Sequence, residues 1–293
     1  MNLSGIIAYP ITPFTEDEQG INYPILAETI ELLIRNGSDA IAPLGSTGES
    51  SYLSLNEWKQ VAEFSVKQAA QRVPVIIGIS ELTTEQAIVK AKYAEMIGAD
   101  GIMVIPVSYW KLTDQEIYDY YQAISDSTSL PIMVYNNPAT SGVDMSPELI
   151  VSMFFEIPNI KMVKESTGDI QRMHRIYKLS SGKLPFFNGS NPLAFAALCA
   201  GASGWCTAAP NLLGKLPKTL YEKVKEGKLA DAQEVFYQQL PLLRYIVAGG
   251  LPKTIKAGLS VKGIDAGQPR KPLHSADATE RKKLQQMLVS IEG

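Results

Sequence analysis

Short apolar runs alternate with amphipathic stretches along most of the chain. Eight runs are almost continuously hydrophobic, as are the strands of a parallel sheet that is covered on both faces. The stretches between them place apolar residues on one side of a helix, most clearly over residues 23–36, 55–70, 84–97 and 114–124. The pattern therefore predicts eight strand-then-helix units. The strands are expected at residues 5–10, 40–45, 73–80, 101–107, 131–136, 161–166, 184–190 and 204–209.

Eight such units favour an α/β fold of the (β/α)8 TIM-barrel type. An open doubly wound sheet is the alternative, but no Gly-x-Gly-x-x-Gly motif follows the first run. Ser54 and Thr113 suit helix N-caps, and Pro147 after Ser146 suits a first helical position. We expect the barrel to occupy residues 1–227. Residues 228–293 have helical patterns throughout and predict a C-terminal helical domain that is joined to the barrel without a flexible linker.

Composition and charge narrow the function classes. The chain has 293 residues, 45% of them hydrophobic, and a formal net charge of -3, which is typical of a globular protein. The basic residues are scattered, so neither nucleic acid nor an anionic membrane is an expected partner. No apolar run approaches the roughly 20 residues that span a bilayer. Because no basic-then-apolar leader is evident, we expect a cytoplasmic protein.

The few cysteines and histidines argue against metal or triad chemistry. Cys199 and Cys206 match no zinc or redox spacing and have apolar neighbours, so we expect reduced structural thiols. His174 and His274 lie in polar segments. We therefore expect no metal site. Proton transfer is left to Tyr, Lys, Ser, Thr, Asp, Glu or the substrate itself.

Lys164 is the most informative residue, because it lies near the end of an apolar run. Strand interiors seldom hold lysine, since burying an unpaired ammonium is costly. At the C-terminal end of a barrel strand, where the chemistry of this fold gathers, a desolvated lysine can lose its proton and attack a carbonyl carbon. Taken alone, a surface lysine whose ammonium reaches solvent is the commoner explanation. Glu165 should point to the opposite side of the strand and is not assigned as the base.

Polar residues also follow other predicted strands. Ser46 and Thr47, after the second strand, offer hydroxyls and backbone N–H groups to a small carboxylate. Tyr135 closes the fifth strand. Each feature has an ordinary structural explanation, such as a tight turn or a packed ring, but their coincidence on one predicted face favours a site. The further candidates for this site are Tyr109, Asn136, Thr140, Gly189, Ser190 and Cys206.

This combination of residues permits imine chemistry. Lys164 would form an imine with a 2-oxo acid, and the protonated imine would accept electrons from a carbanion at the adjacent carbon. Ser46 and Thr47 would hold the carboxylate, while Tyr135, polarised by the Thr47 hydroxyl, would move protons. No cofactor beyond the covalent lysine imine is needed. A catalytically silent barrel that binds a 2-oxo acid is the alternative of another class.

At these residues the chain resembles the dihydrodipicolinate synthase / N-acetylneuraminate lyase family of Schiff-base enzymes. The resemblance covers essentially the whole chain. It implies a barrel with a C-terminal helical domain, usually assembled as a homotetramer of tight dimers. It also implies Lys164 as the imine former, Tyr135 as the proton-transfer residue with Thr47 as its relay, and Ser46 and Thr47 as carboxylate binders. The motifs are Gly45-Ser46-Thr47-Gly48-Glu49, Tyr135-Asn136-Asn137-Pro138 and Lys164-Glu165-Ser166.

Two departures from the family pattern bear on the substrate. Dihydrodipicolinate synthases usually carry an arginine where this chain has Thr140, so a bidentate clamp for the carboxylate of the aldehyde substrate is missing. Ser108 stands where the synthases place a tyrosine that reaches the neighbouring subunit's site, and Tyr109 follows one residue later.

These departures favour an aldolase, dehydratase or deaminase that acts on a hydroxylated 2-oxo acid. A 4-hydroxy-tetrahydrodipicolinate synthase, which condenses pyruvate with aspartate semialdehyde, is the alternative. Neutral hydrogen bonds to a hydroxylated substrate would come from Asn136, Asn137, Thr140, Ser190 and Asn191.

Overall fold

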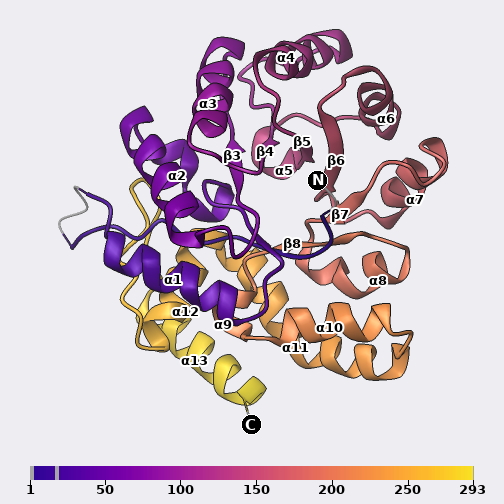
Figure 1. Cartoon of the computed structure of the whole chain (residues 1–293). Coiled ribbons are helices and arrows are strands. Elements are labelled where there is room, and N and C mark those ends of the chain that lie inside the picture. The colour runs from indigo at the N-terminus through magenta and orange to yellow at the C-terminus, as the bar shows by residue number, and fades with distance from the viewer. Residues whose placement is uncertain (1–2, 17–19, 293) are drawn as a thin grey trace.

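Eight parallel strands form a closed ring in the structure, a computed structural model that describes residues 3–16 and 20–292 (Figure 1). The sheet order is β2-β1-β8-β7-β6-β5-β4-β3, and each neighbouring pair is parallel. A parallel bridge between Ile41 and Val75 joins the two ends and closes the barrel. The predicted (β/α)8 barrel is therefore confirmed. Its strands are β1 (Gly5–Ala8), β2 (Ala40–Ile41), β3 (Ile76–Ile79), β4 (Gly101–Val104), β5 (Ile132–Asn136), β6 (Ile160–Glu165), β7 (Phe186–Asn188) and β8 (Gly204–Thr207).

Strand β2 is much shorter than the predicted run over residues 40–45. Pro43 has no N–H to donate to a neighbouring strand, and Leu44 adopts a left-handed φ of 64°. The chain therefore leaves the sheet and folds over β3 at Gly78. A Cβ atom at Gly78 would lie 2.3 Å from the carbonyl oxygen of Leu44, so this close approach requires glycine.

The outer helices begin where the local sequence signals predict. Ser54 and Thr113 each form a capping box, with Glu57 and Glu116 as partners, and the Ser146 side chain caps the helix that opens at Pro147. The major helices around the barrel are α1 (Tyr23–Arg35), α2 (Leu55–Ala69), α3 (Thr84–Met96), α4 (Asp114–Ser127), α6 (Pro147–Glu156), α7 (Ile170–Leu179), α8 (Ala194–Cys199) and α10 (Leu216–Lys225). Shorter turns are η1 (Ser46–Gly48), η2 (Ser50–Tyr52), α5 (Pro138–Ser141), η3 (Asn191–Leu193) and α9 (Pro210–Leu213).

Three further helices lie beside the barrel, coloured orange to yellow in Figure 1. They are α11 (Leu229–Gly249), α12 (Leu251–Val261) and α13 (Ala278–Glu292). Helix α11 continues through Pro241, because burial of Leu242, Leu243 and Ile246 stabilises the helix on the far side of the proline. Helix α12 packs against η1, the turn that follows β2. None of the described helices has the length and apolar content needed to cross a membrane.

Candidate active site

Lys164 is buried near the C-terminal end of β6, with only 6% of its surface exposed. Its partner in the ladder with β5 is Tyr135. The Nζ atom lies 3.7 Å from the centroid of the Tyr135 ring and 4.4 Å from that of Tyr9, which follows β1. The amine is thus held between two aromatic rings and is largely shielded from water. This is the setting that a lysine nucleophile requires.

Tyr135 is buried and its hydroxyl is well connected. The hydroxyl accepts a hydrogen bond of 2.9 Å from Asn137 Nδ2. Burial raises the pKa of Tyr135, but the charge of Lys164 and hydrogen bonds with Asn137, Lys164 and Ser46 together hold that pKa below the usual 10.0. A phenol with a lowered pKa exchanges protons more readily near neutral pH.

Thr47 lies in η1 and is buried. Within the described part of the chain, no hydrogen bond joins its hydroxyl to Tyr135; the hydroxyl partner from this turn is Ser46. The relay role of Thr47 therefore stays a prediction.

A cavity of about 420 Å³ opens at this end of the barrel. Three of the predicted site residues, Ser46, Tyr135 and Thr140, are among the described residues that line it, whereas Lys164 and Thr47 are not. One part of its wall consists of hydroxyls and another of apolar side chains. Glu49 is the only charged residue among the described residues that line it. The hydroxyl wall includes Ser46, Ser50, Ser80 and Ser141, and the apolar wall includes Val107, Leu251, Pro252 and Leu273.

Gly189 makes room for the lysine. A Cβ atom at this position would lie 2.8 Å from Lys164 Cε, 1.8 Å from Ser166 Oγ and 2.9 Å from Ser166 Cβ. All three distances are below those that real Cβ atoms adopt. The contribution of Gly189 to the site is therefore the absence of a side chain beside Lys164.

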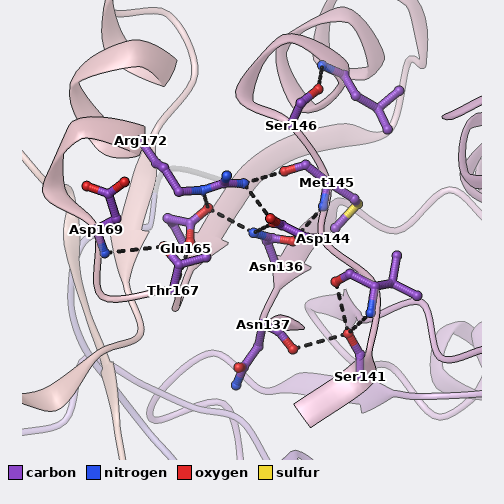
Figure 2. Close-up of polar contacts among 12 residues, drawn as sticks. Asn136, Asn137, Ser141, Asp144, Met145, Ser146, Glu165, Thr167, Asp169 and Arg172 are labelled. Carbon is purple, nitrogen blue, oxygen red and sulfur yellow. Dashed lines mark hydrogen bonds and ion pairs between the residues drawn. The ribbon is translucent and has the colours of Figure 1, made fainter. Parts of the chain in front are cut away.

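Asn136 does not line the cavity, and its side chain is engaged elsewhere. Its side chain is fully buried, and Nδ2 donates to Asp144 Oδ1 and to Glu165 Oε2, each at 3.1 Å. Its Oδ1 atom accepts from the backbone N–H of Met145 at 3.0 Å, so both amide hydrogens and the carbonyl are engaged. Figure 2 shows this cluster, which Arg172 completes by contacting Glu165, Asp144 and the Met145 carbonyl. Glu165 faces away from Lys164, as predicted.

Cys206 lies on β8 beside Tyr9 and near Lys164. Burial is the main reason why its pKa is raised to about 11, so the thiol stays protonated at neutral pH. The Tyr9 hydroxyl donates to Met103 Sδ at 3.2 Å, and burial likewise raises the pKa of Tyr9. Both cysteines are free, but Cys199 is exposed rather than packed in the core as its apolar neighbours predict.

Comparison with known proteins assigns the chain to one family. The sequence profile described as "Dihydrodipicolinate synthetase family" matches residues 2–291. The chain belongs to this family. It is therefore a metal-independent class I lyase, the enzyme class inferred from the sequence. In the described part of the chain, no group of three His, Cys, Asp or Glu side chains is arranged to hold a metal ion.

Individual members of the family match over their full length. The chain is 30% identical over 292 residues to a 4-hydroxy-tetrahydrodipicolinate synthase of Oceanobacillus iheyensis, covering 100% of this chain and 98% of the relative. A crystal structure from Pseudomonas aeruginosa, provisionally named a dihydrodipicolinate synthetase, is 50% identical with a TM-score of 0.97, covering 99% of each chain. The prophage protein YagE of E. coli K12, solved in complex with pyruvate, is 27% identical with a TM-score of 0.94, covering 100% of this chain and 99% of YagE.

The remaining candidates, Ser190 and Tyr109, both lie outside the lining of the cavity. Ser190 forms a tight turn with Asn188, through Ser190 N to Asn188 Oδ1 at 3.1 Å and Asn188 Nδ2 to Ser190 O at 2.9 Å, and it does not line the cavity. Tyr109 is 90% exposed and forms a T-shaped pair with the exposed Trp110. Tyr109 therefore projects outward and takes no part in the cavity of its own chain.

Sequence reasoning missed Tyr9, although a signal for it was present. Tyr9 closes the first apolar run just as Tyr135 closes the fifth. Applying the strand-end criterion to all eight runs would have found the second ring that holds Lys164.

Proposed function

We propose that the enzyme forms a Schiff base with pyruvate or another 2-oxo acid. The favoured substrate is a longer 2-oxo acid whose end remote from the carboxylate is neutral and hydroxylated. In this proposal the Lys164 nitrogen attacks the C2 carbonyl, and the carbonyl oxygen leaves as water after two proton transfers. Ser46 and Thr47 hold the carboxylate beside the cavity. Tyr135 delivers and removes the protons, which its lowered pKa supports.

The protonated imine then withdraws electrons from the neighbouring C3 atom. In an aldolase, the C4 hydroxyl gives up its proton and the C3–C4 bond breaks. The bonding electron pair forms an enamine, and C4 leaves as the carbonyl carbon of an aldehyde. In a dehydratase or deaminase, a C3 proton is lost first, and the enamine expels water or ammonia from C4. Reprotonation and hydrolysis by water release the product and regenerate the Lys164 amine.

The lining of the cavity is the observation that supports a substrate with an uncharged far end. Thr140 stands there in place of a guanidinium, and no lysine or arginine is among the described lining residues. Arg172 is no substitute, because its guanidinium is bound to Glu165, Asp144 and the Met145 carbonyl. A second carboxylate on the substrate would therefore lack a charged partner, whereas hydroxyls would meet Ser50 and Ser80.

The names of the curated relatives favour a second candidate, a 4-hydroxy-tetrahydrodipicolinate synthase that condenses pyruvate with aspartate semialdehyde. The two functions differ in what the far end of the cavity must bind. Borohydride trapping and turnover with a panel of 2-oxo acids separate them. Strong activity with aspartate semialdehyde and none with hydroxylated 2-oxo acids would reject our proposal.

Thr140→Arg provides a sharper form of this test, with Thr140→Ala as its matched control. A charge-assisted hydrogen bond contributes about 2 kcal/mol, so the arginine should improve kcat/KM for aspartate semialdehyde by about 30-fold. The alanine should not. An equal effect of both variants would show that position 140 does not face the far end of the substrate.

We further propose a homotetramer in which Tyr109 approaches the neighbouring subunit's site. Its exposure next to Trp110 at the cavity end of β4 supports this arrangement. Mass measurement in solution tests the assembly. Lys164→Ala tests the silent-binder alternative, because a pure binder would keep its affinity for the 2-oxo acid.

A further inference from the structure

Helix α12 reaches the turn that carries Ser46 and Thr47 through a buried ion pair. Lys256 Nζ lies 2.6 Å from Glu49 Oε1, and the two side chains are 1% and 0% exposed. The same ammonium donates to the Gln268 carbonyl at 3.0 Å and lies 4.1 Å from the centroid of the Phe14 ring. The second carboxylate oxygen of Glu49 accepts from the backbone N–H of Arg270 at 2.7 Å. Two separate C-terminal segments thus hold one side chain.

The backbone of Glu49 is strained at the place where this side chain is held. Its φ of 55° and ψ of 33° lie in the left-handed region, which disfavours residues other than glycine. Its N–H donates to the Ser46 carbonyl and so closes η1. Backbone strain of this kind persists only where the surroundings enforce it. The contacts to Glu49 therefore fix the shape of the turn that begins at Ser46.

Stability alone does not explain such a pair. Desolvation of two buried charges can cancel their attraction, and apolar residues of similar volume often replace them without loss of stability. The pair lies two residues from Thr47, however, and the first turn of α12 lines the same cavity through Leu251 and Pro252. Helix α12 therefore supplies both a wall of the cavity and an anchor for its turn.

We propose that Glu49 and Lys256 are positioning residues, which hold Ser46 and Thr47 in the geometry that receives the substrate carboxylate. This inference rests on the proposed function for the role of Ser46 and Thr47. It makes the C-terminal helical region part of the active site, because the turn depends on Lys256 of α12 and on the segment around Arg270.

The test uses the double variant Glu49→Gln/Lys256→Met, which removes both charges and leaves none unpaired. The readout is the pyruvate concentration that gives half-maximal borohydride trapping of Lys164, together with the trapping rate at saturation and the melting temperature. We expect the half-saturating concentration to rise at least tenfold, and the saturated rate to change less than threefold. Half-saturation at the wild-type concentration would overturn the proposal.

Two further variants keep the result interpretable. Lys218→Met is the matched control, because it breaks an ion pair of 2.6 Å with Asp39 at the opposite end of the barrel. It should lower the melting temperature without moving the half-saturation. If the double variant does not fold, Glu49→Gln alone keeps the shape of the side chain and should still raise the half-saturation at least threefold; no rise would overturn the proposal. If wild-type protein traps no 2-oxo acid, the proposed function fails instead.

Discussion

Gly189→Ala is the smallest change expected to disturb Lys164, the proposed imine former. The added methyl carbon would lie 2.8 Å from Lys164 Cε, while ordinary contact begins at 3.4 Å, so the lysine must retreat by about 0.6 Å. The two contacts with Ser166, at 1.8 and 2.9 Å, prevent the methyl group from moving the other way. A misplacement of about 1 Å can cost about 100-fold in rate.

We therefore expect kcat/KM to fall by about 10- to 100-fold, or about 1.4–2.7 kcal/mol of transition-state stabilisation. Overpacking should also lower the free energy of unfolding by about 1–3 kcal/mol. The assay is the rate of borohydride trapping of pyruvate on Lys164, read by peptide mass, with a thermal melt of the same sample.

Two companion variants locate the cause. Gly20→Ala adds the same methyl group where the nearest atom, Thr15 Oγ1, would be 3.7 Å away, and it should leave trapping unchanged. Gly189→Ala/Ser166→Ala removes the closest clash but keeps the one with Lys164, so trapping should remain slow. Wild-type trapping and melting in Gly189→Ala would refute the reasoning.

Three further predictions concern charge and buried polar groups. Lys164→Ala should raise the pKa of Tyr135, because the charge that offsets burial is gone. Near-ultraviolet titration of tyrosinate measures this pKa, and Tyr135→Phe identifies its signal. A pKa that fell or stayed the same would contradict the prediction. The hydrogen bond from Arg72 lowers the pKa of Glu31 to about 2, so the pair stabilises the fold above pH 4.5 and loses that effect as the pH falls through about 2. Arg72→Gln should thus lower the melting temperature at neutral pH but not below pH 2, and an equal loss at both would be inconsistent with this cause. Asn136→Ala should reduce the free energy of unfolding by about 1–3 kcal/mol in urea melts, because it leaves buried partners unsatisfied, and unchanged stability would argue against its structural role.

The parts of the fold that depend on local signals were predictable from the sequence. Continuous apolar runs located all eight strands, and Ser54 and Thr113 located two helix starts because a capping box is complete within four residues. The length of β2 was harder to predict, since the apolar run continues while Pro43 and the left-handed Leu44 end the ladder.

Alternation along strands explains where the side chains of Glu165 and Asn136 lie. Neighbouring residues on a strand face opposite sides. This rule places Glu165 away from Lys164 and Asn136 away from Tyr135, and the Asn136–Glu165 hydrogen bond shows both side chains on that opposite side. Cys199 is exposed although its neighbours in sequence are apolar, because those neighbours do not determine which side of α8 packs against the protein.

Contacts between distant segments left no local signal. Lys256 and Glu49 are separated by most of the chain, and nothing in either neighbourhood indicates the other. Lysines such as Lys253 and Lys256 are typical of an exposed helix face, whereas the folded chain buries Lys256.

The close approach at Gly78 limits how this pocket can be redesigned. Any side chain at that position would clash with the Leu44 carbonyl next to the turn that carries Ser46 and Thr47, so a combinatorial library gains nothing by varying it. Variation at Thr140, Leu251 and Leu273, which line the cavity from other segments, leaves that turn intact. New substrate ranges should therefore be accessible through the far wall, while the turn proposed to hold the carboxylate stays the same.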